Sequence, residues 1–242
     1  MAQYIYGKNT VLLRLQNGAS IQKLFLLENS KWTDVMALAK QSATPIAFVS
    51  RAALDKMVNG NHQGIVAQVE EYRYFSVEEM LASIDSNKQP LLVMCDGLED
   101  PHNLGAILRT ADAVGVDGII IGKHRAVGLT PTVAKVSTGA IETVKVSQAT
   151  NLTQTLEDLK KKGFWVCGAD SEKAMDYRQA DFNVPLVLVI GSEGFGLSKL
   201  VKKHCDFTVK LPMVGKVTSL NASVATGILL YQIYSNRHPH SN

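Results

Sequence analysis

From residue 90 onward, the chain alternates uninterrupted apolar runs with stretches of helical periodicity. The apolar runs, most of them closed by Gly or Asp, occupy residues 91–97, 118–122, 164–170, 185–194 and 207–212. Between them, apolar residues recur at helical spacing over residues 103–115, 131–142, 151–163 and 196–205. Such alternation is typical of a parallel sheet that is covered on both faces. The pattern predicts an α/β fold with a mostly parallel sheet, whose ligands bind at the carboxyl ends of the strands.

The first 71 residues have a mixed pattern that predicts a small α/β domain. Helices are expected over residues 9–18, 31–43 and 51–60, and strands over residues 21–28, 44–50 and 64–74. A polar run at residues 76–89, acidic at its start, is typical of a domain boundary. We therefore predict a small domain over residues 1–71, a linker over 72–89 and a larger domain over 90–242.

The segment from Leu211 to Tyr234 is unusual because residues 217–236 contain no charged side chain. It allows three interpretations: a membrane span, a capped core helix, or a ligand site at a helix N-terminus. A span needs about 20 predominantly apolar residues, whereas hydroxyl and amide side chains crowd the front half of this segment. We therefore reject the span and expect a helix with apolar residues on more than one face. Residues 1–16 lack the apolar core of a signal peptide, so none is expected.

Amino-acid composition excludes few functional classes. The formal net charge is +3, and residues 1–70 carry the largest basic excess for their length, which is compatible with a polyanionic partner. The three cysteines, Cys95, Cys167 and Cys205, lie far apart, and neither they nor the six histidines have metal-ligand spacing. We expect no metal site, no disulfide and a cytoplasmic protein with reduced thiols.

The phosphate-binding motifs of common α/β folds are absent. The first strand is followed by residues 98–109, which lack the G-x-G-x-x-G spacing of a dinucleotide site. The sequence GSEGFG at residues 191–196 has its glycines in another order, and Lys216 is followed by Val217 rather than by Ser or Thr. A nicotinamide-dependent oxidoreductase is therefore disfavoured.

Three polar clusters that follow predicted strands supply the candidate chemistry. In the first, Asn103 is expected to cap a helix, and Gly105 allows close backbone approach. The apolar neighbours of Arg109 predict that this arginine has an anionic or bidentate partner. In the second, a buried strand ends at Gly191 and is followed by a single carboxylate, Glu193.

The third cluster stands before the uncharged final helix. Leu211–Met213 closes a strand, and Ser219, Asn221 and Ser223 stand at the entrance of the helix. Free backbone N–H groups and the positive end of the helix dipole favour acceptor groups at this position.

Together the clusters resemble the three signature motifs of the SPOUT methyltransferases of the SpoU/TrmH branch. The motifs are N-x-G-x-x-x-R at residues 103–109, G-x-E-x-x-G at 191–196, and L-P-M at 211–213 followed by S-L-N-x-S-x-A at 219–225. The resemblance covers residues 90–236 without a departure from the pattern. Residues 1–70 resemble the small ribosomal-protein-like domain with which some members bind RNA.

The resemblance implies a deep trefoil knot in the C-terminal part, a homodimer, and S-adenosylmethionine as methyl donor to a ribose 2′-hydroxyl of RNA. The implied catalytic residues are Arg109, Asn103, Glu193, Ser219 and Asn221, and the implied cofactor-binding residues are Gly191, Leu211, Met213 and Leu220. An arginine side chain stays protonated and is a poor base. We therefore expect Arg109 to clamp an RNA phosphate and to stabilise the developing alkoxide, held in register by Asn103 and Glu193.

The acceptor RNA is the least determined part of this prediction. The length and the two-domain layout resemble the family's 23S rRNA guanosine 2′-O-methyltransferases, so a guanosine of large-subunit rRNA is the expected substrate. A tRNA ribose is the alternative. A non-catalytic RNA-binding protein on the same scaffold is the rival from another functional class.

Overall fold

The computed structural model describes residues 3–239, and the contacts within it divide the chain into two compact units. The first unit comprises the chain up to Arg73 together with Leu129–Thr143. The second comprises Tyr74–Gly128 and the chain from Val144 onward. The segment Leu129–Thr143, which lies between two strands of the second unit in sequence, is thus part of the first unit.

The first unit is built on a four-stranded sheet. Its strands are β1 (Gln3–Tyr6), β2 (Lys23–Leu27), β3 (Ile46–Val49) and β4 (Ile65–Val69), and its helices are α1 (Lys8–Gln16), α2 (Thr33–Gln41), α3 (Arg51–Met57) and α6 (Pro131–Val136). The strand order is β1-β4-β2-β3, with β4 antiparallel to both of its neighbours and β2 parallel to β3. The three helices and three strands predicted in residues 9–74 are confirmed with shorter bounds. Sequence inspection missed β1 because it is four residues long and does not alternate.

Alternation along these strands gives the first unit a core on each side of its sheet. On one face, Phe25 and Val66 pack with Tyr6 and with Leu54 of α3. Their strand neighbours Leu24, Leu26, Ile5 and Ala67 are fully buried and point to the opposite face. The sheet is therefore covered on both sides although its strands are short.

A buried ion pair fixes the segment Leu129–Thr143 within the first unit. Nη1 of Arg14 donates to Oε1 of Glu142 at 2.6 Å, and the two side chains are 7% and 10% exposed. The Arg14 guanidinium also lies over the ring of Tyr72, 5.1 Å from its centroid. Burial, and then the Glu142 carboxylate, raise the pKa of Tyr72, so the phenol stays neutral. Because a buried charge without its partner is costly, Arg14 and Glu142 depend on each other.

The second unit is built on a seven-stranded sheet in which every pairing is parallel. Its strands are β5 (Leu91–Asp96), β6 (Gly118–Gly122), β7 (Val146–Ala149), β8 (Trp165–Ala169), β9 (Met175–Asp176), β10 (Leu186–Gly191) and β11 (Phe207–Lys210), and its helices are α4 (Val77–Ala82), α5 (Pro101–Val114), α7 (Leu152–Lys161), α8 (Lys199–His204) and α9 (Ala222–Arg237). The order is β7-β6-β5-β10-β8-β11-β9. The five predicted strands are confirmed. β7 and β9 were missed because β7 carries Ser and Gln and β9 has two residues.

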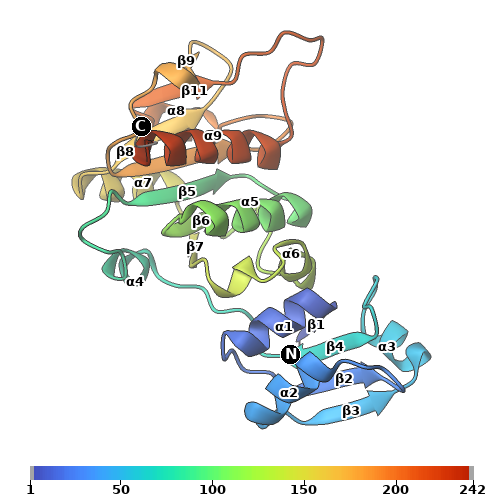
Figure 1. The fold of residues 1–242 in the computed structure, drawn as a ribbon. Helices are drawn as coiled ribbons and strands as arrows, with labels where there is room; N and C mark the ends of the chain where they lie inside the picture. Colours follow the sequence, from blue (N-terminus) through green and yellow to red (C-terminus); the bar gives the residue numbers. More distant parts are fainter. Residues whose placement is uncertain (1–2, 240–242) are drawn as a thin grey trace. The chain divides into compact units, whose positions relative to one another are not determined.

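Helices cover both faces of this sheet, as the continuous apolar strands predicted. Leu92 and Met94 of β5 join a core with side chains of α4, α7 and α8. The intervening residues, Val93 and Cys95, are also fully buried and point the other way. α5 and α9 pack side by side (Figure 1). Burial raises the pKa of the Cys95 thiol to about 12, so this cysteine is an inert core side chain.

The predicted helix over residues 131–142 is wrong in its second half. α6 ends at Val136, and Thr138 and Gly139 both have left-handed backbone, with φ of 51° and 104°. A side chain at Gly139 would overlap Leu13. Apolar spacing continues through this stretch, but the two left-handed residues end the helix. A separate 3₁₀ turn, Ala140–Glu142, follows.

Among the helices of residues 3–239, none combines the length and the apolar character needed to cross a membrane. α9, the helix of the uncharged segment, is 16 residues long and has both buried and exposed apolar side chains.

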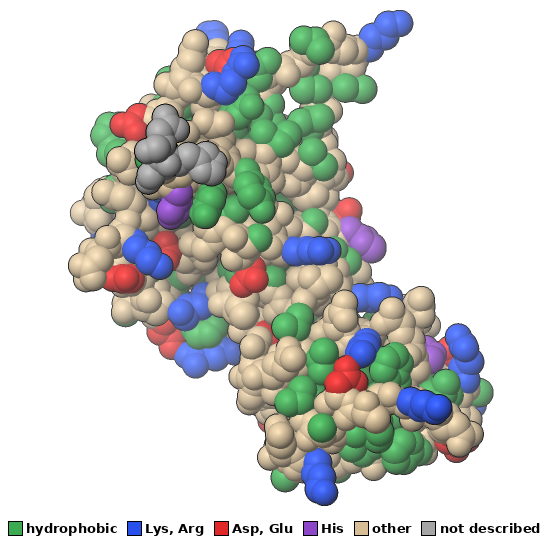
Figure 2. All heavy atoms as spheres, in the orientation of Figure 1, with side chains coloured by type: hydrophobic (Ala, Val, Ile, Leu, Met, Phe, Trp, Pro, Cys, Tyr) green, Lys and Arg blue, Asp and Glu red, His purple; other side chains and the backbone are tan. Residues whose placement is uncertain are grey.

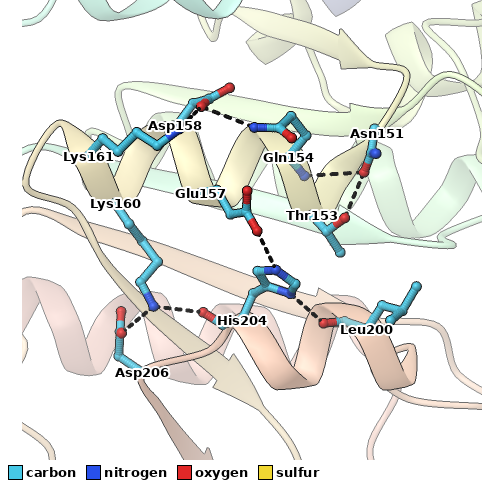
Figure 3. A network of polar contacts seen from close by, with 10 residues as sticks. All are labelled: Asn151, Thr153, Gln154, Glu157, Asp158, Lys160, Lys161, Leu200, His204 and Asp206. Carbon is cyan, nitrogen blue, oxygen red and sulfur yellow. Dashed lines mark hydrogen bonds and ion pairs between the residues drawn. The ribbon is translucent and has the colours of Figure 1, made fainter.

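A network of polar side chains joins α7 to α8 (Figure 3). Nδ1 of His204 bonds to the carbonyl oxygen of Leu200 at 2.8 Å, and Nε2 bonds to Oε1 of Glu157 at 3.0 Å. The Leu200 carbonyl and then the Glu157 carboxylate raise the pKa of His204 above its ordinary value. The protonated ring, which donates from both nitrogens, is therefore the form that fits this network.

We expect the protein to lose a small part of its stability as the pH rises from mildly acidic to mildly alkaline values. A raised pKa in the folded state means that the contribution of His204 is complete below about pH 6.5 and is lost as the pH rises through the raised pKa. His204→Gln should lower the free energy of unfolding by about 0.5 kcal/mol at roughly pH 5.5, and by less at roughly pH 8. Urea denaturation at both pH values tests this. An equal difference at the two would contradict it.

Candidate active site

α5 begins just after the loop that follows β5. Its N-cap is Asp100, whose Oδ1 accepts from the backbone N–H of His102 at 2.8 Å, and Pro101 is the first helical residue. The prediction that Asn103 caps this helix is wrong, because Asp100 and Pro101 already provide the cap and the favoured first residue. Asn103 instead lies inside the first turn and is 3% exposed. Its amide is therefore available to other elements.

Asn103, Glu193 and Asn221 form one hydrogen-bonded cluster, to which each of the three motifs contributes a residue. Nδ2 of Asn103 donates to Oε1 of Glu193 at 3.0 Å. Nδ2 of Asn221 donates to Oδ1 of Asn103 at 2.8 Å and also to Oε1 of Glu193. Chain segments 90 and 118 residues away from Asn103 are thus joined at the carboxyl ends of β5 and β10.

Asn221 also starts the last helix. Its Oδ1 accepts from the backbone N–H groups of Ser223 and Val224, at 3.0 and 3.2 Å, and from the Ser223 hydroxyl at 2.6 Å. These bonds make Asn221 the N-cap of α9. The backbone N–H of Ala222 also points to Oε1 of Glu193, at 3.4 Å. The carboxylate therefore lies at the positive end of the α9 dipole, where a negative charge is stabilised.

A tight turn after β10 presents Glu193. Ser192 and Gly196 exchange two backbone hydrogen bonds, of 3.1 and 2.9 Å, across the turn. Gly191 is buried, and a Cβ added there would overlap the backbone of Gly196 and Leu197. Glycine at position 191 is therefore required by the closeness of the two backbones.

The loop between β11 and α9 extends away from the sheet (Figure 1) and carries most of the third motif. Leu211 and Leu220 are half-buried at its ends, and Met213 is exposed between them. Within the described part of the chain, the backbone groups of residues 213–220 make no hydrogen bond, and neither does the exposed Ser219 side chain. These backbone groups face solvent, so they and the apolar side chains beside them are accessible to a ligand with both apolar and polar parts.

Arg109 stands apart from the cluster. It is exposed on α5, and among residues 3–239 its guanidinium has no hydrogen-bond or ion-pair partner. The prediction that Asn103 and Glu193 hold Arg109 is therefore wrong for the single chain. Six residues of helix separate Arg109 from Asn103 by about 9 Å along the axis and by roughly 240° around it. Their side chains consequently leave the helix in different directions.

A hollow on the second unit lies at the opposite end of the sheet from the cluster. It has a volume of about 740 Å³, and Pro90, Phe164 and Pro185, which precede β5, β8 and β10, line it. Ligands of parallel sheets bind at the carboxyl ends of strands, so we do not assign this hollow to the active site. In the described residues, no group of His, Cys, Asp and Glu side chains is arranged to hold a metal ion.

The parallel sheet, the Gly191 turn and the polar cluster beside an exposed loop define an α/β protein with a candidate ligand site at the carboxyl ends of β5 and β10. The chain belongs to the SpoU rRNA Methylase family, whose sequence model matches residues 90–231. Residues 4–75 match a second family model, described as RNA 2′-O ribose methyltransferase substrate binding. The predicted architecture, a mostly parallel α/β domain behind a small N-terminal α/β domain, is confirmed. The trefoil knot stays a prediction.

Similar proteins support the family along the whole chain. YacO of Bacillus subtilis (strain 168) is named as a TrmH family tRNA/rRNA methyltransferase. It is 52% identical to this protein over an alignment that covers 98% of this chain and 96% of YacO. The AdoMet-bound rRNA methyltransferase from Sinorhizobium meliloti is 26% identical, with a TM-score of 0.82 over 99% of this chain and 88% of its own. The TrmH/SpoU tRNA modifying enzyme of A. aeolicus is 33% identical, with a TM-score of 0.56 over 62% of this chain and 76% of its own.

Proposed function

We propose that this protein transfers a methyl group from S-adenosylmethionine to a ribose 2′-hydroxyl of RNA. The observation that carries the proposal is the cluster of Asn103, Glu193 and Asn221, one residue from each family motif, beside a loop with free backbone groups. Gly191, Leu211, Met213 and Leu220 are the residues that would hold the cofactor. When bound, it supplies an electrophilic methyl group on a sulfonium.

The residues of this chain would have two roles: some position the substrate and the loop, and Arg109 stabilises the charge that develops during transfer. The cluster ties the start of α9 to α5 and to the Gly191 turn, and so anchors the end of the 211–220 loop. Ser219, on that loop, would orient the ribose. Arg109 has no polar partner within residues 3–239 and carries a permanent positive charge. It can therefore bind the RNA phosphate and stabilise the alkoxide that forms as the hydroxyl loses its proton.

A guanosine of 23S rRNA is the substrate that we favour, and a tRNA ribose is the second candidate. The rRNA methyltransferase from S. meliloti aligns with 99% of this chain, which includes the N-terminal unit. The tRNA modifying enzyme of A. aeolicus aligns with 62% of it. We assign RNA capture to residues 1–71 and methyl transfer to residues 90–242, joined by 72–89. The free cysteines fit the reducing cytoplasm, where we expect the protein to act.

Labelled methyl transfer tests this proposal and separates it from non-catalytic RNA binding. The purified protein is incubated with methyl-labelled S-adenosylmethionine and with protein-free 23S rRNA or bulk tRNA. We expect label in the rRNA, at a nucleotide whose 3′ phosphodiester resists alkaline hydrolysis because its 2′-oxygen is blocked. Label in tRNA alone would favour the second candidate. No label in either RNA, or no cofactor binding in calorimetry, would overturn the enzyme assignment.

We further infer a homodimer, because α9 has an unpartnered apolar stripe. Ala222, Leu229 and Ile233 are buried within the second unit. Val224, Ile228 and Tyr231, spaced by four and three residues, are 50%, 38% and 54% exposed on another face. A second copy packed on this stripe would cover it. It would also bring further groups toward Arg109, which has no polar partner in the part of one chain that the structure describes.

Ile228→Glu tests the dimer. A carboxylate in the middle of the stripe should prevent apolar packing between copies, so sedimentation should change from a dimer to a monomer. Thermal unfolding should change little, because Ile228 is partly exposed. Asn236→Glu, on another face of α9, is the control and should stay dimeric. A parent protein that sediments as a monomer, or an Ile228→Glu variant that remains a dimer, would contradict this interface.

A further inference from the structure

A short basic turn follows β6 at the same edge of the sheet as the active-site cluster. Lys123, His124 and Arg125 are consecutive and exposed. β6 and β10 are both neighbours of β5, and the register aligns Ile121 with Cys95 and Gly191 with Asp96. The ends of β6 and β10 are thus two strand spacings apart, roughly 10 Å. At about 3.4 Å of rise per nucleotide of a stacked strand, this corresponds to about three nucleotides.

The backbone holds this turn in place from both sides. The N–H of Lys123 donates to the carbonyl of Ala149 at 2.9 Å, and the N–H of Val127 donates to the carbonyl of Leu98 at 2.8 Å. Arg125 has a left-handed backbone with φ of 52°, which is unfavourable for a side chain of this size. The backbone of the turn is therefore held in place, so little backbone freedom is lost when the two charged side chains bind a ligand.

Lys123 and Arg125 have no competing polar partner in the described part of the chain. Within residues 3–239, neither Lys123 nor Arg125 forms an ion pair or a side-chain hydrogen bond, whereas Lys160 and Lys202 of the same unit pair with Asp206 and Asp170. Two carboxylates of the site already have partners: Asp100 caps α5, and Glu193 accepts from two amides. An external anion can therefore approach the turn.

We propose that Lys123 and Arg125 bind backbone phosphates of the substrate RNA about three nucleotides from the methylated ribose, and so position that ribose at the site. The proposal rests on the proposed function and adds to it a contact that no family motif includes. A repeating anion fits the observations because two exposed cations lie two positions apart in one short turn at this edge of the sheet. Because the proposed contact is to backbone phosphates, it is independent of base sequence.

Filter binding to protein-free 23S rRNA, between about 50 and about 200 mM KCl, tests the proposal. The double variant Lys123→Gln/Arg125→Gln should bind about tenfold more weakly at the low salt concentration. The slope of log K against log[KCl] should become shallower by about 1.5, since each lost phosphate contact removes about 0.7 to 0.9. Affinity for S-adenosylmethionine, measured by calorimetry, should stay at the parent value.

The matched control is Lys88→Gln/Lys162→Gln, which removes two exposed charges at the amino ends of the strands. Its salt slope should equal that of the parent. If the Lys123/Arg125 variant behaves like this control, or if its cofactor affinity falls in parallel, the phosphate contact is refuted while the methyltransferase assignment stands. A parent protein that neither binds nor methylates 23S rRNA or tRNA would refute the proposed function, and this inference with it.

Discussion

Arg109→Ala is expected to lower methyl transfer by about 10²- to 10³-fold while the protein stays folded and keeps its affinity for S-adenosylmethionine. The magnitude is typical for removal of one group that stabilises charge developing in a transition state. Folding should be unaffected because Arg109 is exposed and, among residues 3–239, its guanidinium forms no hydrogen bond or ion pair. Single-turnover transfer to rRNA gives the rate, and calorimetry and thermal unfolding give the two unchanged quantities.

Arg109→Lys is the matched control, because lysine keeps the positive charge and loses the planar fork of donors. We expect a rate between those of the parent and of Arg109→Ala. Transfer by Arg109→Ala at the parental rate would show that Arg109 has no part in the chemistry. A loss of cofactor binding together with the rate would give Arg109 a structural role instead.

Gly191→Ala is expected to disturb the structure of the site more than the other substitutions, and to lower both stability and cofactor affinity. A methyl group at this position would overlap the backbone of Gly196 and Leu197, which cannot move without opening the turn that presents Glu193. Such overpacking typically costs about 1–3 kcal/mol of stability. Since the turn also adjoins the proposed cofactor site, affinity for S-adenosylmethionine should fall by about 100-fold or more, which corresponds to a similar free energy.

Gly194→Ala is the control in the same turn. Position 194 has open space around it and no left-handed backbone, so alanine should leave unfolding and cofactor affinity near the parental values. Equal behaviour of the two variants would show that the closeness of Gly191 to Gly196 and Leu197 does not control the site. A stable Gly191→Ala protein with normal cofactor affinity would show that the conformation of this turn does not determine cofactor binding.

Sequence reasoning worked best where a single physical requirement acts on neighbouring residues. Strands such as β5 and β10 are buried on both faces and must be apolar throughout, so their apolar runs predicted them correctly. It was least accurate where local signals compete. Asp100 and Asn103 can both cap a helix, and the structure selects Asp100 because Pro101 follows it. Apolar spacing continued across Thr138 and Gly139, although their left-handed backbone ends α6.

The sequence predicted which residues belong to the candidate site. It did not predict how their side chains are arranged in space. Asn103, Glu193 and Asn221 were named from their motifs, and the structure joins them directly. Arg109 belongs to the same motif as Asn103 but leaves α5 in another direction, a consequence of helical geometry that a motif does not express. The basic turn at Lys123 and Arg125 was missed because three residues after a strand form no recognisable motif. Their closeness to the site becomes visible only when the neighbouring strands are placed in register.

The sequence by itself determined the α/β class, the alternation of strands and helices, the family motifs and the residues that carry candidate chemistry. These properties depend on side-chain type and local spacing, and both are visible in one dimension. Only the tertiary structure decided that Asn221 both caps α9 and binds Glu193, and that Leu129–Thr143 belongs with the first unit. It also showed that Arg109 has no polar partner among residues 3–239. The physical reason is that each of these depends on contacts between residues far apart in sequence, and strand order and helix packing set those distances.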